Sequence, residues 1–247
     1  MTRSWIKHQP WVIGLAALLA ASLTVSLGLW QLRRADQKLG LQAAMAQRQA
    51  LPPLSNADLR ASDDTQAMWH RPAALRGLWV AEATVFLDNR QMDQRQGFYV
   101  VTPLRLTSDG RLLLVQRGWV PRDFQDRTKV PEVPTPVNTE VVVSGRMAAA
   151  PAKVYELGHS GSGPIRQNLY IGDVAKALDA NVIDGSLVQL APVASSPDDG
   201  LERHWPAVAV DVHKHHGYAF QWFGLSALIV FLYVWFQIIS PWRQARV

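Results

Sequence analysis

The chain has 247 residues, of which 25 are Lys or Arg and 20 are Asp or Glu, and its formal net charge is +5. It contains no cysteine, which excludes disulfides, thiolate metal sites and a cysteine nucleophile. Four basic residues lie in the terminal tails, so the region between them, with 21 basic and 20 acidic residues, lacks the basic excess of a nucleic-acid-binding domain.

The first predicted element is a membrane-spanning helix over residues 11–32. No charged side chain occurs between Lys7 and Arg33, and the apolar body runs from about Trp11 to Trp30. A helix needs roughly 20 apolar residues to cross the hydrocarbon core. A cleaved signal peptide is the alternative, but this run exceeds the ~7–15 residues of a signal-peptide core and lacks a small-residue cleavage site.

Good helix formers continue over Ala35–Gln49, so the helix is predicted to extend beyond the membrane until Pro52-Pro53 ends it. The polar stretch Ser55–Gln66 then predicts a loop with one helical turn.

The middle of the chain predicts a mostly antiparallel β domain with short helices. The strongest signal is a hairpin in which Gly97–Leu106 and Leu112–Val120 pair across Asp109-Gly110, with Gly110 supplying the positive φ of the turn. Proline-rich Pro131–Pro136 predicts a loop or a sheet edge. A short helix is expected over Asp173–Leu178, with Asp173 near its N-cap. Further strands are expected at Thr84–Asp88, Glu140–Met147, Leu187–Leu190 and Ala207–Val212.

The sequence shows no arrangement that predicts catalysis. The run Gly158–Pro164 matches neither a Gly-x-Ser-x-Gly nucleophile elbow nor a phosphate-binding loop, and a surface loop explains it better. The carboxylates are scattered without acid/base spacing. We therefore expect no catalytic residues and no enzymatic activity.

Three of the seven histidines, His213, His215 and His216, lie where the chain approaches a second apolar segment. Two imidazoles on one face could bind a metal or haem iron, or the group could simply mark the lipid headgroup region. Aromatic side chains also gather at this level, namely Trp30, Tyr218, Trp222 and Phe223. They form either an interfacial aromatic belt or the walls of a cleft for a flat, hydrophobic, anionic cofactor such as haem.

The second span is predicted over residues 217–240, because no charged residue occurs between Lys214 and Arg243. The basic tails carry Arg3, Lys7, Arg243 and Arg246, which places both termini in the cytoplasm, although Arg33, Arg34 and Lys38 oppose this locally. The predicted organisation is thus a tail over 1–10, a span over 11–32, an extramembrane domain over 33–216, a span over 217–240 and a tail over 241–247.

Four motifs in order resemble the surfeit locus protein 1 (Surf/Shy) family, which are assembly factors for cytochrome c oxidase. They are Leu27–Arg34, Gly97–Leu104, Gln116–Pro121 and Tyr218–Phe223, and the likeness covers the whole chain. The family's first-helix motif continues to Gln37-Lys38, where Gln replaces a Trp. Its re-entry motif aligns His215 with the histidine implicated in haem a binding, while His213, Lys214 and His216 replace Asn, Asn and Leu.

The resemblance implies an assembly factor that binds haem a and aids its insertion into oxidase subunit I, together with other assembly factors. His215 would ligate the iron, Tyr218, Trp222 and Trp30 would provide aromatic surface, and Arg34 could neutralise a propionate, as could Arg33 or Lys214. The expected location is a bacterial inner membrane, with the domain in the periplasm. The alternatives are a membrane-anchored scaffold that binds oxidase subunits without haem and, less favoured, an anchored periplasmic enzyme.

Overall fold

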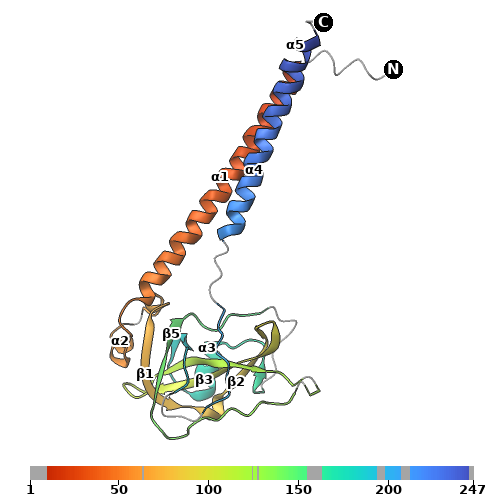
Figure 1. The fold of residues 1–247 in the computed structure, drawn as a ribbon. Helices are drawn as coiled ribbons and strands as arrows, with labels where there is room; N and C mark the ends of the chain where they lie inside the picture. Colours follow the sequence, from red (N-terminus) through yellow and green to blue (C-terminus); the bar gives the residue numbers. More distant parts are fainter. Residues whose placement is uncertain are drawn as a thin grey trace. The chain divides into compact units, whose positions relative to one another are not determined.

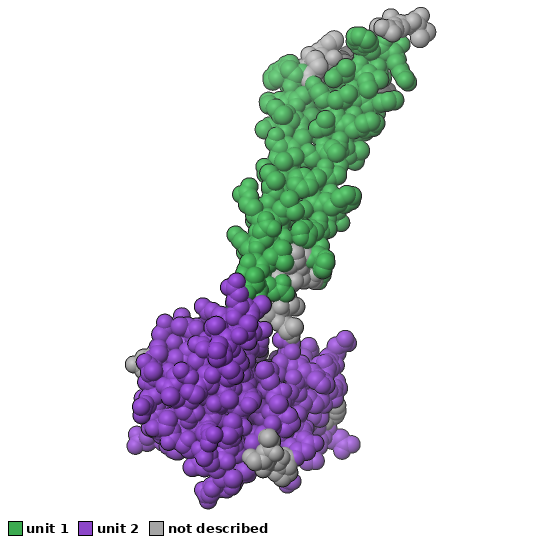
Figure 2. Space-filling view, turned by 60° about the vertical axis from the view of Figure 1, so that its left-hand side comes forward, with its two compact units in different colours: residues 1–44, 208–247 green, residues 45–207 purple. Residues whose placement is uncertain are grey.

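A computed structural model describes residues 10–62, 64–123, 125–126, 128–154, 163–193, 198–206 and 212–244. The chain divides into two compact units, coloured separately in Figure 2. One unit combines Met1–Ala44 with Val208–Val247, and the other is Met45–Ala207.

The first unit contains two long apolar helices. Helix α1 (Pro10–Gln49) is continuous, which confirms the predicted extension to Gln49, and α4 (Val212–Val234) runs into a five-residue π-helical segment, η4 (Trp235–Ile239), and α5 (Ser240–Gln244) (Figure 1). Both helices are long and apolar enough to cross a membrane. Only 11% and 6% of their most apolar stretches are buried within the protein, so they differ from the core helices of a soluble domain.

The second unit begins with the short helix α2 (Asn56–Ala61), the helical turn predicted between Ser55 and Gln66. Its start is fixed by Ser55, whose backbone N–H donates to Asp58 Oδ2 at 2.7 Å. In return, the Ser55 side chain accepts from the backbone N–H of Asp58. The two contacts form a capping box, which satisfies backbone donors that have no partner in the first helical turn. A 3₁₀ turn, η2 (Gln66–Met68), leads into the first strand.

Five strands of this unit close into a barrel. Strand β1 pairs with both β5 and β3, which gives the ring order β1-β5-β7-β4-β3-β1. The neighbours are antiparallel except for the parallel pair β4 and β7. This is the strand order of the OB-fold, a small Greek-key barrel. The barrel strands are β1 (Pro72–Trp79), β3 (Arg95–Leu106), β4 (Leu112–Pro121), β5 (Val141–Ala148) and β7 (Val182–Gln189).

Two further strands extend the sheet from β3. Strand β2 (Val85–Met92) follows the 3₁₀ turn η3 (Ala81–Ala83) and pairs antiparallel with β3, and the two-residue β6 (Ile165–Arg166) adds to β2 in parallel. Helix α3 (Ile171–Leu178) lies between β6 and β7 in the chain. The predicted mostly antiparallel β domain with short helices is therefore confirmed.

The hairpin β3–β4 forms as predicted. Arg105 lies opposite Leu112 in the antiparallel register, and the intervening Gly110 has φ +75°. A left-handed backbone there strains residues that have a Cβ, which explains why the turn uses glycine.

Both faces of β4 are buried. Leu113 and Val115 contribute to the main core with residues of all five barrel strands, whereas Leu114 belongs to a second core that includes Val174 of α3. Successive side chains of a strand point to opposite faces, so one apolar run supplies two cores.

The structure corrects three details of the prediction. Helix α3 begins at Ile171, two residues earlier than predicted, with Tyr170 as its N-cap and Asp173 in its first turn. Strand β7 begins at Val182 and ends at Gln189, earlier at both ends than expected. Of the strand predicted at Ala207–Val212, residues 207–211 lie outside the described residues, and Val212 begins α4. Strand β1 was not among the runs named as strands. The predicted loop Gly158–Pro164 lies largely outside the described residues, and Pro131–Pro136 forms the expected loop.

Candidate functional site

Small residues bring α1 and α4 together. Gly14, Ala21 and Gly28 recur at every seventh position of α1. A Cβ on Gly28 would come within 2.6 Å of the Phe223 ring, and one on Gly14 within 2.9 Å of the Tyr233 hydroxyl. The Ser226 hydroxyl donates to the Ala21 carbonyl at 3.2 Å in a buried position. Membrane helices associate through such small residues, because close packing replaces the missing hydrophobic driving force.

The same helix pair brings together the first and the last of the four motifs that suggested the family. His215 Nδ1 lies 2.7 Å from Gln31 Oε1, in a partly buried hydrogen bond between residues 184 positions apart. Gln31 belongs to the motif Leu27–Arg34, and His215 lies just before Tyr218–Phe223. An amide oxygen only accepts hydrogen bonds, so this hydrogen bond requires a proton on Nδ1 of the imidazole.

The other predicted cofactor-binding residues fall into two groups. Trp222 is part-buried on α4, two turns after His215. Tyr218 and Trp30 are 51% and 55% exposed, and Arg34 is an exposed residue whose Nη1 donates to Gln37 Oε1 at 3.3 Å. Helix α4 begins at Val212, so His215, Tyr218 and Trp222 lie on successive turns, as the spacing required.

Histidines 213 and 216 occupy the exposed surface of the same helical turn. Among the three histidines, His215 contacts α1 through the hydrogen bond of its Nδ1 with Gln31. Gln31 lies within the Leu27–Arg34 motif, but no role was predicted for it from the sequence. A single chain provides no signal that pairs two polar residues on helices at opposite ends of the sequence.

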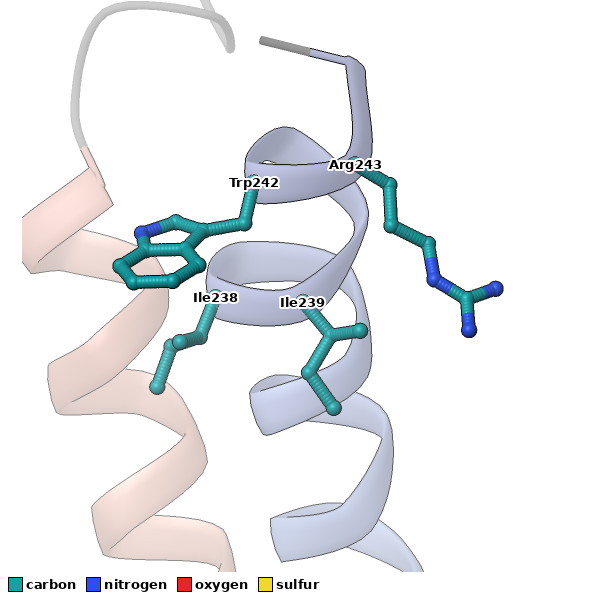
Figure 3. Close-up of a pocket in the computed structure, with 4 residues that line it drawn as sticks. All are labelled: Ile238, Ile239, Trp242 and Arg243. Atoms are coloured by element: carbon teal, nitrogen blue, oxygen red, sulfur yellow. The ribbon is translucent and has the colours of Figure 1, made fainter. Parts of the chain in front are cut away.

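A separate hollow lies beyond the end of α4, on η4 and α5. It has a volume of about 290 Å³ and is lined by Ile238, Ile239, Trp242 and Arg243. Figure 3 shows the Arg243 side chain extending away from Trp242. Ile238 follows His215 by 23 residues of helix, a rise of about 35 Å, so this hollow is not part of the His215 site.

The Gln116–Pro121 motif of the β domain has a structural role. The Trp119 side chain is fully buried, and its indole Nε1 donates to the Arg90 carbonyl at 3.1 Å. Arg117 Nη2 lies 3.5 Å from Asp199 Oδ2, and its guanidinium lies over the Trp79 ring at 5.0 Å. Burial lowers the pKa of Arg117, although the neighbouring Asp199 carboxylate opposes this shift. Arg117 therefore both stacks on an aromatic ring and pairs with a carboxylate.

One group of side chains in the described part of the β domain has the composition of a metal site. Ligand atoms of Asp93, Glu202 and His204 lie within 4.8 Å of one another. His204 Nδ1 is 2.7 Å from Asp93 Oδ2, and Glu202 pairs with Arg95. Because each carboxylate already has a basic partner and the group is open to solvent, surface ion pairs account for it.

The fold and the helix pair together define a class of protein, in which an OB-like barrel domain lies in the sequence between two candidate membrane spans. The spans contact each other through small residues and a glutamine–histidine pair. The chain belongs to the SURF1 family, whose model matches residues 18–227 and so includes all four motifs. The resemblance seen in the sequence is confirmed.

Similar proteins occur in bacteria and eukaryotes. A SURF1-like protein of Rickettsia bellii is 25% identical over 222 residues, covering 89% of this chain and 88% of the relative. The Surfeit locus protein 1 of Arabidopsis thaliana is 28% identical over 125 residues, which cover 47% and 35% of the two chains. A Saccharomyces cerevisiae protein named cytochrome oxidase assembly protein SHY1 is 27% identical over 94 residues, covering 38% and 24%.

Proposed function

We propose that this protein is a cytochrome c oxidase assembly factor that binds haem a through His215 and aids its insertion into the catalytic subunit. Family membership and the name of the yeast relative support the assembly role. The observation that supports haem binding is the hydrogen bond between His215 Nδ1 and Gln31 Oε1. A proton on Nδ1 leaves the lone pair of the ring on Nε2, where it can bind iron. Neutral imidazole with this tautomer is a haem iron ligand in many proteins.

The residues around His215 fit a haem. Trp222 lies two turns further along α4 and offers an aromatic surface, and the Phe223 ring packs against Gly28 of α1. Trp30 and Tyr218 add exposed aromatic surface to the same helices. Arg33, Arg34 and Lys214 provide positive charge for propionates, and the tail of haem a would lie in the adjacent lipid. When bound, the haem iron supplies an axial coordination position, and the protein holds the cofactor without chemical turnover.

We place the protein in a bacterial inner membrane, with both termini in the cytoplasm and the barrel domain in the periplasm. The basic residues of the two tails favour this orientation. Subunit I of the oxidase and other assembly factors are the proposed partners.

Haem retention by the purified full chain tests the proposal. Protein from cells that make haem a should carry a Soret band, and His215→Ala should remove or weaken it without changing membrane insertion. His204→Ala is the matched control, because it removes a histidine of the β domain. His213→Ala and His216→Ala are tested singly and together with His215→Ala, since either ring might substitute. Full haem retention in the triple variant would eliminate the site and favour a scaffold without haem.

A further inference from the structure

The Gln31 side chain lies on the face of α1 that contacts α4. Gln31 lies three residues after the buried Gly28 and four before the fully buried Ala35, so it shares their helical face. Its Oε1 meets His215 Nδ1 at 2.7 Å. The amide therefore meets the imidazole at a partly buried contact between the two helices.

This contact has a chemical consequence for the imidazole. A neutral histidine carries one ring proton, and the nitrogen without it provides the lone pair that binds a metal. Gln31 Oε1 can only accept, so it favours the tautomer with the proton on Nδ1 and the lone pair on Nε2. In metal sites, such an acceptor also fixes the ring orientation and raises the basicity of the ligating nitrogen.

We propose that Gln31 is a positioning residue that fixes His215 as the Nδ1–H tautomer and so makes Nε2 the iron ligand. The iron-ligand half of this inference rests on the proposed haem function. The tautomer half concerns the protein alone and is tested without haem.

The first experiment measures the tautomer in the haem-free full chain in detergent. Imidazole ¹⁵N NMR at a pH where histidine is neutral, with the His215 signals assigned by their loss in His215→Ala, should show the proton on Nδ1. Gln31→Leu has a similar size without an acceptor, and it should shift His215 toward the Nε2–H form. A wild-type His215 protonated on Nε2, or a tautomer unchanged in Gln31→Leu, would overturn the proposal.

The second experiment measures haem. Gln31→Leu should weaken haem a binding by about 10-fold or more, the usual effect of removing a partner of a metal ligand. Gln31→Glu keeps an acceptor and makes it anionic, so it should retain haem and lower its midpoint potential. The potential is the decisive readout, because a purely structural role of Gln31 would not shift it in this direction.

Ser226→Ala provides the matched control. It removes another polar contact of the same helix pair, the 3.2 Å hydrogen bond to the Ala21 carbonyl, and should leave haem affinity and potential unchanged. Wild-type affinity in Gln31→Leu would overturn the role of Gln31 while leaving haem binding intact. If the NMR result holds but the wild-type protein takes up no haem, the tautomer assignment stands and the iron-ligand role falls with the proposed function.

Discussion

Asp199 lies between two arginines inside the β domain. Its carboxylate pairs with both Arg117 and Arg203, and all three side chains are 8% exposed or less. Arg117 also donates to the Pro134 carbonyl at 3.0 Å, so the cluster ties strand β4 to the proline-rich loop and to the segment that leads toward α4. A buried carboxylate that neutralises two cations is hard to remove, because each cation then lacks its counter-charge.

We therefore expect Asp199→Ala to lower the free energy of unfolding of the β domain by about 3–5 kcal/mol. Glu202→Gln is the control, since it removes only the more exposed pair with Arg95 and should change the free energy by about 1 kcal/mol or less. Urea titration of the full chain, followed by tryptophan fluorescence, measures both. Similar losses in the two variants would contradict the assigned role of Asp199.

Among the elements, the paired helices α1 and α4 make the most specific contact. Ala21 and Ser226 meet through a buried hydrogen bond, and Gly28 lies against the Phe223 ring. The absence of native cysteine allows this contact to be tested by cross-linking.

The variant Ala21→Cys with Ser226→Cys should form an intramolecular disulfide in membranes under mild oxidation, because the two positions lie side by side. Leu18→Cys with Leu228→Cys is the control, since those side chains are 64% and 50% exposed. The faster-migrating oxidised band on a non-reducing gel should appear for the first pair alone. Equal cross-linking of both pairs would show that the helices have no fixed contact face.

The elements also show why some parts of the fold were predictable. The β3–β4 hairpin was predicted because its two apolar runs flank an Asp-Gly turn, a purely local signal. Strand β1 was missed because Pro72–Trp79 contains no β-branched residue. Its buried residues include Ala73, Leu75 and Trp79, and these apolar residues at alternate positions were the available signal in the sequence.

For the candidate site, the sequence located the helix that bears His215 and the aromatic residues on it. The Gln31 contact could not be predicted, because it depends on how two distant helices rotate against each other. The seven-residue spacing of Gly14, Ala21 and Gly28 was a partial signal, since it marks the face of α1 that packs. It identifies a face but not a partner.

At the scale of the whole molecule, the arrangement of the basic residues predicts the orientation in the membrane. Reporters fused at Val247 and inserted after Ser160 should report opposite compartments, with the C-terminus cytoplasmic. Replacing Arg243 and Arg246 by Gln should weaken this preference, whereas replacing Arg203, which lies within the long central domain, should not. Alkaline phosphatase and green fluorescent protein reporters measure the two sides. A periplasmic C-terminus would contradict the orientation.

The position of β7 between β4 and β5 determines when the barrel can close during synthesis. This strand fits between β4 and β5, yet it is the last of the five to be synthesised. Until residues 182–189 emerge, β4 and β5 each present an unpaired edge, and exposed edges promote aggregation. A growing chain must therefore leave the barrel open between β4 and β5 for the time needed to make the connection after β5, and nascent chains that end within this connection should be strong clients of holding chaperones.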